Sequence, residues 1–523
     1  MKKLLSVILA AVIFSLTVVP AFAAQNLDNG KTPLVVVCGM NVYPLIKDKG
    51  TPDEKQVWAP VIDMNEVVLK GLYGAASAAF FRDWNKLGDV VVPIANKLLE
   101  PAACNADGDS KYNISATIFP KSMAYYPDVA NGGYSEQGLV HSACDALGPD
   151  HVYLFNYDWR TDPLVNADAL NTLIKTALAE TSHNKVDLAV CSLGANQALA
   201  YFAKYGGNDI ESCVFLSAAF GGSLVASEIF TKQIVIDKNV LKRYVNQTVT
   251  SSENVNFIVD ILLDVLDAAG ALDRVLNLAN TGTKALVDRA FNEVLQDNLC
   301  TMPGLWALVR EGNYETAKNA MLDKTKYAKL IARIDNFHYN VRVKRQDIIS
   351  NLMKQGVTVT FCSHYDYSSM PVFPSAAGQS DGLVETPCTS GGAACAPLGG
   401  TFPAGYIQKN SLGGKNYISP DRVIDASTCM FPDQVWFFKD VHHVACPYGS
   451  DYNAFVLWLL AQKAQPTVWT DARYPQFFGT NDNGQTLYPL AETPVIKPDM
   501  QKIILSVFEA VLNLKKSLSA FSF

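Results

Sequence analysis

The sequence predicts an α/β fold, in which a mostly parallel central sheet carries helices on both faces and a large helical cap is inserted into it. Short apolar runs typical of buried strands alternate with segments whose apolar residues recur at helical spacing. One run breaks abruptly at Ser192, and a helical segment follows at once. After the next strand-like run, strand patterns vanish over a long helical stretch. This alternation is typical of a parallel sheet covered by helices.

Strand and helix patterns follow one another along the chain. Strands are predicted at residues 33–37, 151–156, 186–190, 213–217, 357–362 and 435–438. Helices are predicted at residues 63–81, 90–99, 166–178, 195–205, 254–278, 450–463 and 499–518. In the helix at 254–278, Asp260, Asp264 and Asp267 share one face, which indicates a solvated surface rather than a cation site.

These patterns divide the chain into consecutive parts. We expect a signal peptide over 1–23, a first part of the core over 24–223 with an insertion at about 61–149, a helical cap over 224–347, a second part of the core over 348–470, and a C-terminal extension with a final helix over 471–523.

The composition excludes some classes of protein. The chain has 523 residues, of which 49% are hydrophobic and 18% charged, enough for a large buried core. The formal net charge is -7 and no basic cluster recurs, so we expect no nucleic-acid partner.

The N-terminus has the pattern of a secretory signal peptide. A positively charged start and an apolar run over residues 4–19 are followed by a small-x-small cleavage signal that ends at Ala23. An uncleaved membrane anchor is the alternative, but the run is short for a bilayer span of roughly 20 residues. We therefore expect cleavage near Ala23 and a mature protein that is secreted or held in the cell envelope.

The eleven cysteines fit an exported chain. Those in apolar strand-like runs are expected to be buried free thiols: Cys38, Cys191, Cys213 and Cys362. Among the others, we predict the disulfides Cys388–Cys395, Cys429–Cys446 and Cys104–Cys144. No cysteine spacing matches a zinc site, so no metal is expected.

Ser192 is predicted to be a nucleophile at a strand-to-helix turn. Such a turn lifts the hydroxyl out of the sheet, and the amide of Leu193 then points toward the place where an oxyanion develops. The crowded turn favours small residues two positions before and after the serine. Gly194 meets the second demand, whereas Val190 occupies the first position, where glycine is usual. An ordinary turn with a capping serine is the alternative, but the pattern favours the α/β-hydrolase fold.

A serine nucleophile needs a base and an acid that orients the base, and in this fold the acid precedes the histidine. His442 and His443 follow a late strand and precede a C-terminal helical segment. We prefer His443, which lies deeper in the turn, and keep His442 in reserve. For the acid we prefer Asp381, which a glycine and two apolar residues follow. Asp366 is the reserve, with a polar turn residue as its other interpretation.

The oxyanion needs a second amide. The first strand ends at Cys38-Gly39, where glycine lets the backbone turn. The next amide, that of Met40, is therefore the candidate donor beside that of Leu193. A plain glycine turn is the alternative.

With these residues in place, the chain resembles the lecithin:cholesterol acyltransferase-like family of lipases, phospholipases and acyltransferases. The most specific piece is Tyr157-Asp158-Trp159-Arg160, directly after the predicted strand at 151–156. Further resemblance lies in the nucleophile, acid, histidine and oxyanion segments, at 186–194, 380–384, 441–444 and 35–40. The chain departs from the family at Val190, Cys191 and Cys38, where the family has glycine, histidine and proline.

The resemblance implies a secreted esterase, lipase or phospholipase, or an acyltransferase, that acts on lipid esters without a cofactor. A large apolar cap over such a site could act as a lid, contact a lipid surface transiently and line an acyl pocket. Trp159 and Trp306 are the aromatic candidates for that pocket, although an aromatic residue in an apolar segment more often lies in the core. An exported binding or surface protein on an inactive hydrolase scaffold is the alternative.

Overall fold

The computed structural model describes residues 32–40, 42–58, 85–130, 136–233 and 287–490, together with residues 235, 237, 239, 240 and 243. The predicted signal peptide lies outside the described residues, as do the predicted helices at 63–81, 254–278 and 499–518 with Asp260, Asp264 and Asp267.

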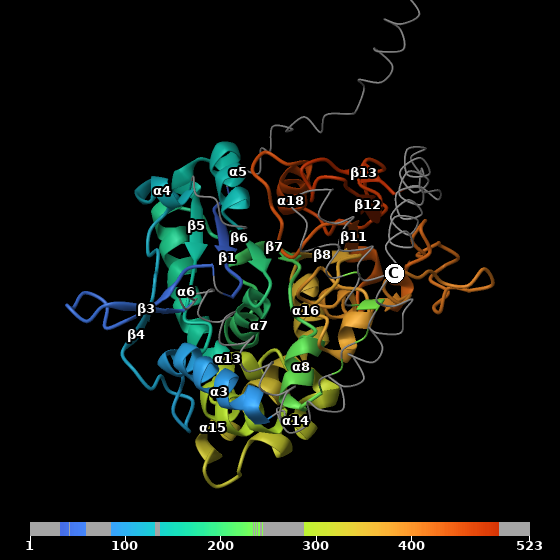
Figure 1. The fold of residues 1–523 in the computed structure, drawn as a ribbon. Coiled ribbons are helices and arrows are strands. Elements are labelled where there is room, and N and C mark those ends of the chain that lie inside the picture. The colour runs from blue at the N-terminus through green and yellow to red at the C-terminus, as the bar shows by residue number, and fades with distance from the viewer. Residues whose placement is uncertain are drawn as a thin grey trace, which may run out of the picture.

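An eight-stranded sheet forms the centre of the fold, in the order β13-β12-β11-β8-β7-β6-β1-β5 (Figure 1). Its strands are β1 (Leu34–Val37), β5 (Val152–Phe155), β6 (Val186–Cys191), β7 (Ile210–Leu216), β8 (Thr358–Tyr365), β11 (Val435–Lys439), β12 (Phe477–Gly479) and β13 (Tyr488–Pro489). All neighbours pair in parallel except β12 and β13. The predicted parallel sheet and its six strands are confirmed. β12 and β13 were not predicted, because such short strands leave no periodic pattern.

Helices cover both faces of this sheet. Alternate residues of each strand point to opposite sides, so that Val35 and Val37 join one core and Leu34 and Val36 the other. The first core is completed by α6 (Pro163–Thr181), α7 (Gly194–Tyr205) and α16 (Arg345–Lys354), and the second by α5 (Gln137–Leu147) and α18 (Asp451–Leu460). The predictions of helices at 166–178, 195–205 and 450–463 are thereby confirmed, with small shifts of their ends.

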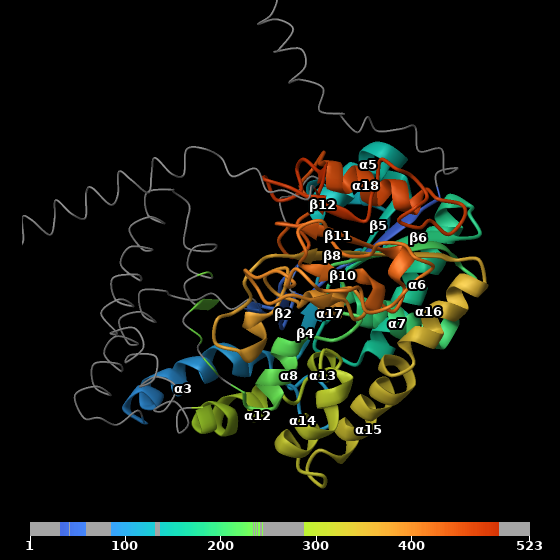
Figure 2. The same ribbon diagram turned by 90° about the vertical axis from the view of Figure 1, so that its right-hand side faces the viewer.

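Helices also fill the described part of the chain between β7 and β8. They are α8 (Leu224–Phe230), α12 (Gln296–Asn298), α13 (Pro303–Trp306), α14 (Tyr314–Met321) and α15 (Ala328–Phe337), before α16 returns to the sheet. With α3 (Asn85–Leu99), this helical layer lies on the side of the molecule opposite α5 and α18 (Figures 1 and 2). It has a core of its own around Trp306 and Tyr314. Among the described residues, no helix has both the length and the apolar character needed to cross a membrane.

Short elements complete the description. One small sheet has the order β3-β2-β4 and another pairs β10 with β9. Their bounds are β2 (Leu45–Lys47), β3 (Lys55–Trp58), β4 (Ile114–Ala116), β9 (Ala394–Cys395) and β10 (Ile424–Asp425), and two further short helices are α4 (Pro127–Ala130) and α17 (Thr386–Thr389).

The predicted disulfides are wrong, because all eleven cysteines are free thiols. Cys429 packs in the core on one face of the sheet and Cys446 in the core on the other, so the sheet itself separates them. Cys104 and Cys144 are separated in the same way.

The members of the third predicted pair also pack in different apolar clusters, Cys388 with Ala219 and Val384, and Cys395 against the first core. Cys388 lies in the short helix α17, whereas Cys395 lies on β9, and its thiol donates a hydrogen bond to the carbonyl of Ala393. The prediction of buried free thiols in the central strands is confirmed for Cys38, Cys191, Cys213 and Cys362.

Arg342 joins the helical layer to the sheet. Its side chain is fully buried and donates hydrogen bonds to the carbonyl oxygens of Ala219 and Phe220, which follow β7. It also donates to the Asn196 side chain in α7 and to the carbonyl of Ala307, directly after α13. One guanidinium therefore satisfies buried acceptors from three segments that are distant in sequence.

Replacing Arg342 by Met should lower the free energy of unfolding by about 3 kcal/mol, because several buried acceptors lose their donor. Urea unfolding followed by circular dichroism measures this change. Arg473→Met, which removes a partly exposed ion pair with Asp471, is the control and should cost less than about 1 kcal/mol. Equal losses in the two variants would contradict the bracing role of Arg342.

Candidate active site

Ser192 occupies a strained turn between β6 and α7. β6 ends at Cys191, α7 begins at Gly194, and Ser192 between them has a φ of 49°. This left-handed conformation is costly for a residue other than glycine and is typical of a nucleophile elbow. The turn is held by hydrogen bonds from Ser192 N to the Leu216 carbonyl (3.1 Å) and from Ala219 N to the Ser192 carbonyl (3.0 Å).

The turn needs glycine at position 194 but not at position 190. A Cβ on Gly194 would lie 2.7 Å from the carbonyl oxygen of Cys38, a distance that the backbone does not tolerate. Val190 instead stands in β6 opposite Val37 and Phe215 of the neighbouring strands, with its side chain in the core. The valine is therefore accommodated by the sheet, and the turn forms without glycine two residues before Ser192.

The structure brings Ser192, His443 and Asp381 together in one chain of hydrogen bonds. His443 Nε2 lies 2.8 Å from Ser192 Oγ, and His443 Nδ1 lies 2.8 Å from Asp381 Oδ2. Ser192 follows β6, Asp381 lies in the loop after β8, and His443 follows β11. All three side chains therefore project from the carboxyl ends of parallel strands, at one edge of the sheet.

Backbone groups fix the Asp381 carboxylate in place. Its second oxygen, Oδ1, accepts hydrogen bonds from the amides of Leu383 (2.9 Å) and Val384 (2.7 Å). The amide of His443 also donates to the Asp381 carbonyl (2.8 Å). Gly382, the residue after Asp381, has a φ of 96°, and a Cβ on it would lie 2.7 Å from His442 Nε2. The Asp-Gly sequence is thus required by this turn.

Asp381 and His443 each stabilise the charged form of the other. Burial alone would lower the pKa of His443, but the charge of Asp381, its hydrogen bond and a further contribution from Glu136 raise this pKa above the ordinary histidine value. Burial alone would raise the pKa of Asp381, but the attraction of His443 and the hydrogen bonds outweigh it and lower this pKa. Asp381 is therefore a carboxylate at neutral pH, and His443 is poised to gain a proton.

A buried histidine supports the turn that carries His443. His364 lies inside β8, and its Nδ1 is 2.9 Å from Ser217 Oγ while its Nε2 is 2.7 Å from the Tyr452 hydroxyl. Burial lowers its pKa to about 4, so this ring is neutral at physiological pH. Ser217 Oγ also accepts a hydrogen bond from the amide of Val444 (3.4 Å), which stands at a φ of 47°. This network stabilises a backbone conformation that a β-branched residue rarely adopts.

The predicted oxyanion loop lies directly beside Ser192. A Cβ on Gly39 would lie 2.9 Å from the Cβ of Ser192, so only glycine fits. The Tyr157 hydroxyl donates to the carbonyl of Cys38 (3.1 Å) and holds the loop from behind. The amide of Gly39 is engaged by a carboxylate oxygen of Glu136 (3.2 Å). Met40 is the next residue, and it lines the same cavity as Ser192 and Leu193.

The cavity at Ser192 has a volume of about 310 Å³ and is mainly apolar. Its lining combines Ser192, His443 and the oxyanion loop with residues of the helical layer. The apolar lining consists of Met40, Val42, Leu193, Ala219, Val225, Ala226, Ile229, Leu305, Leu308, Met370, Leu383, Val384 and Val444. Glu136 and the cap residues of this lining were not predicted from the sequence.

Several predicted residues lie elsewhere. Trp159 packs edge-on against Trp58 in the core, and Trp306 packs with Phe230 in the core of the helical layer. Neither tryptophan is among the residues that line the cavity at Ser192, and their role as pocket residues stays a prediction. Both side chains are large and apolar, so the sequence pattern predicts that they are buried. It does not predict which neighbours they contact.

The two reserve candidates do not contact Ser192 in the described hydrogen bonds. His442 packs against Tyr367 and Gly382, and its amide donates to Asn483 Oδ1 (2.7 Å). Asp366 forms ion pairs with Arg243 and Lys439 instead of approaching His443. The structure thus assembles the preferred residues and not the reserves.

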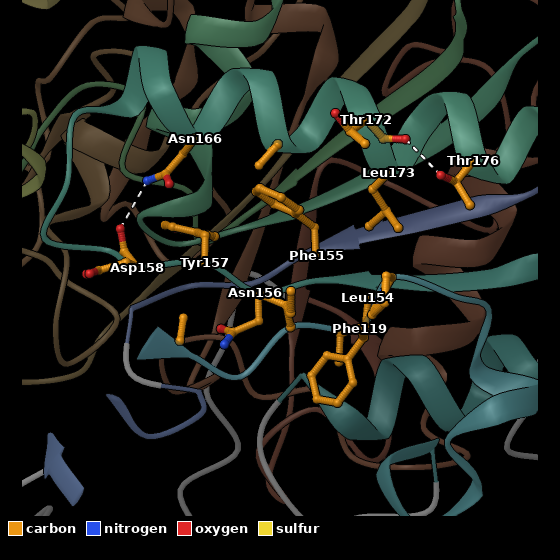
Figure 3. Close-up of a pocket in the computed structure, with 14 residues that line it drawn as sticks. Phe119, Leu154, Phe155, Asn156, Tyr157, Asp158, Asn166, Thr172, Leu173 and Thr176 are labelled. Carbon is orange, nitrogen blue, oxygen red and sulfur yellow. Dashed lines mark hydrogen bonds between the residues drawn. The ribbon is translucent and has the colours of Figure 1, made fainter. Parts of the chain in front are cut away.

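A second cavity, of about 470 Å³, lies beside the edge strand β5. In Figure 3, Leu173 of α6 and Phe119 line it around the end of β5. It shares no lining residue with the cavity at Ser192. The Tyr157 side chain lines it and also touches the oxyanion loop through the Cys38 carbonyl. Within the described ranges, no group of three or more His, Cys, Asp or Glu side chains is placed to hold a metal ion.

Comparisons with known proteins define no family. No protein-family model matches the chain, and no curated protein matches it. Among solved structures, the chain is similar to a chain of the Tle4-Tli4 complex, with 12% sequence identity and a TM-score of 0.28, over 82% of this chain and 97% of that chain. A similarity of that size does not place the chain in a family.

The geometry predicts how the pKa of His443 responds to its partner. In Asp381→Asn, burial dominates, and the pKa of His443 should fall below the ordinary histidine value of about 6.5. Nuclear magnetic resonance titration of the ring protons measures it. Asp366→Asn removes a carboxylate that pairs with Arg243 and should leave this pKa unchanged. A pKa of His443 that is the same in Asp381→Asn and in the wild type would contradict the assignment.

Proposed function

We propose that this chain is an exported serine carboxylic-ester hydrolase of the α/β-hydrolase fold, with Ser192, His443 and Asp381 as its catalytic residues. The hydrogen-bonded chain from Asp381 through His443 to Ser192 carries this proposal. It is supported by the positive φ of Ser192 at the junction of β6 and α7. The order of these residues in the chain is the one that the fold uses.

The geometry supports a two-stage mechanism. Ser192 Oγ attacks the carbonyl carbon of the ester while His443 Nε2 takes its proton, and Asp381 stabilises the imidazolium that forms. The amides of Leu193 and Met40 receive the oxyanion. When the tetrahedral intermediate collapses, the bond to the alcohol breaks and His443 protonates the departing oxygen. Water, or an acceptor alcohol in a transferase, then attacks the acyl-enzyme with His443 again as the base. These steps need no cofactor.

The cavity favours an apolar acyl group. Its volume of about 310 Å³ lies at the lower end of the ~300–1,000 Å³ typical of small-molecule sites. Two of its apolar lining residues, Met370 and Leu383, are exposed to solvent by 38% and 44%. Exposed apolar residues at the mouth of an apolar cavity suit a lipid ester presented at a surface. We therefore propose lipid esters as substrates and transient contact of this rim with a lipid surface.

The resemblance to the lecithin:cholesterol acyltransferase-like family fits this proposal. In its most specific segment, Tyr157 supports the oxyanion loop, and Asp158 pairs with the buried Arg160. Trp159 packs against Trp58. Each residue of the tetrapeptide thus makes a contact that supports the oxyanion loop or the adjoining core. Membership of the family, and export through residues 1–23, are part of the proposal.

Ser192→Ala tests the proposal most directly. It should lower kcat for nitrophenyl esters by about 10⁴-fold or more, because the nucleophile is lost. A fluorophosphonate probe followed by mass spectrometry should label wild-type protein at Ser192 and leave the variant unlabelled. Ser223→Ala, which removes another hydroxyl of the cavity, should still be labelled at Ser192. A folded wild-type protein that takes no label would instead support the non-catalytic binding protein.

The pH dependence of ester cleavage follows from the raised pKa of His443. The base must be neutral to accept the proton of Ser192, so kcat/KM should rise with pH as His443 loses its proton. Because Asp381 holds this pKa above the ordinary value, half-maximal activity should fall above pH ~6.5. Initial rates between about pH 5 and pH 9 give the profile. A midpoint well below that value would contradict the coupling of His443 to Asp381.

A further inference from the structure

Glu136 supplies a second carboxylate at the candidate site, where it contacts the oxyanion loop beside Ser192. Its Oε1 accepts the hydrogen bond from Gly39 N at 3.2 Å. A Cβ placed on Gly39 would lie 3.0 Å from this oxygen and 3.4 Å from Ser192 Oγ. Glu136 and Ser192 also line the same cavity, so a group bound at Ser192 lies close to this carboxylate. In the described lining of the cavity, Glu136 and His443 are the acid–base side chains.

The position of Glu136 is fixed by the helix that follows it. Glu136 is the N-cap residue of α5, and only 3% of its surface is exposed. The side chain of Gln137 donates to the Tyr43 hydroxyl (2.8 Å). A Cβ on Gly138 would lie 1.9 Å from the carbonyl oxygen of Cys446, so the start of α5 packs directly against the segment that follows His443. The carboxylate is therefore held by the same segments that build the site.

We propose that Glu136 determines substrate specificity by excluding acyl groups that carry a negative charge close to the scissile carbonyl. This inference rests on the proposed ester-hydrolase function. Two like charges in a poorly solvated cavity repel each other far more strongly than in water. A neutral acyl group meets no such penalty, and a positively charged one is attracted. The substrate class is thus narrowed to esters of uncharged or cationic acids.

Glu136 also acts on His443. Burial would lower the pKa of His443, while Asp381 and then Glu136 raise it. Glu136 therefore stabilises the imidazolium that forms when Ser192 attacks, although it opposes the oxyanion. Burial and the charge of Glu136 also raise the pKa of the neighbouring Cys38 and Cys191 thiols, which stay neutral.

The test compares three nitrophenyl esters on the full chain: neutral pentanoate, anionic glutarate and cationic 4-(trimethylammonio)butanoate. Glu136→Gln keeps an oxygen that can accept from Gly39 N but removes the charge. The ratio of kcat/KM for glutarate to that for pentanoate should rise by about tenfold in this variant. The ratio of kcat/KM for the cationic ester to that for pentanoate should fall. Glu136→Asp, which keeps the charge, should retain the wild-type order of preference.

Controls separate this inference from the proposed function. Glu54→Gln changes a surface carboxylate that accepts a hydrogen bond from Gly50 N (2.7 Å), and its ratios should equal those of the wild type. Ser192→Ala measures spontaneous hydrolysis, and fluorophosphonate labelling shows which variants keep a working nucleophile. If a labelled Glu136→Gln protein shows unchanged ratios, the role of Glu136 is overturned and the hydrolase proposal stands. If the wild-type protein takes no label, the hydrolase proposal itself is overturned. If the glutamine variant does not fold, equal wild-type rates for the anionic and cationic esters would overturn the inference, and a clear cationic preference would support it.

Discussion

The close approach of two backbone turns is the constraint on which the rest of the site depends. The turn after β6 and the turn after β1 touch each other, and each meets the other through a glycine, Gly194 and Gly39. Neither glycine can carry a side chain unless the opposite turn moves. Because β1 and β6 are paired in register from Leu34 to Val37, one strand pair sets the positions of Ser192 and of the turn at Gly39 together. The acid and the histidine must then be brought to that point by other strands.

Bringing them there costs backbone strain, which the surrounding structure offsets. Ser192, Ser217 and Val444 all stand at positive φ, each at the end of a strand or in the turn of His443. Such residues cost roughly 1–3 kcal/mol each and persist only where the surroundings over-determine them. Here the surroundings are the neutral His364 and its hydrogen bonds to Ser217 and Tyr452. The buried, neutral His364 thus stabilises the turn that carries His443.

The sequence predicts those parts of the site whose determinants are local. An apolar run, a serine and a glycine are enough to indicate the turn at Ser192, and chain order then selects Asp381 and His443. It does not predict contacts that depend on how distant segments meet. Glu136 reaches Gly39 across 97 positions, and its own segment looks like any helix start. Two of the predicted cysteine pairs are wrong because the sheet separates their members. An apolar pattern places Trp159 and Trp306 in the core without specifying which surface of the core each ring faces.

The two carboxylates of the site differ in what their surroundings let them do. Asp381 is fully buried, and its oxygens are engaged by His443 and by two backbone amides, so its charge acts on the imidazole and is shielded from a substrate. Glu136 shares the cavity with Ser192, so its charge acts on whatever occupies that cavity. Both carboxylates raise the pKa of His443, and Asp381 contributes more than Glu136. The proposed selectivity by charge is therefore compatible with the hydrogen bonds that join Asp381, His443 and Ser192.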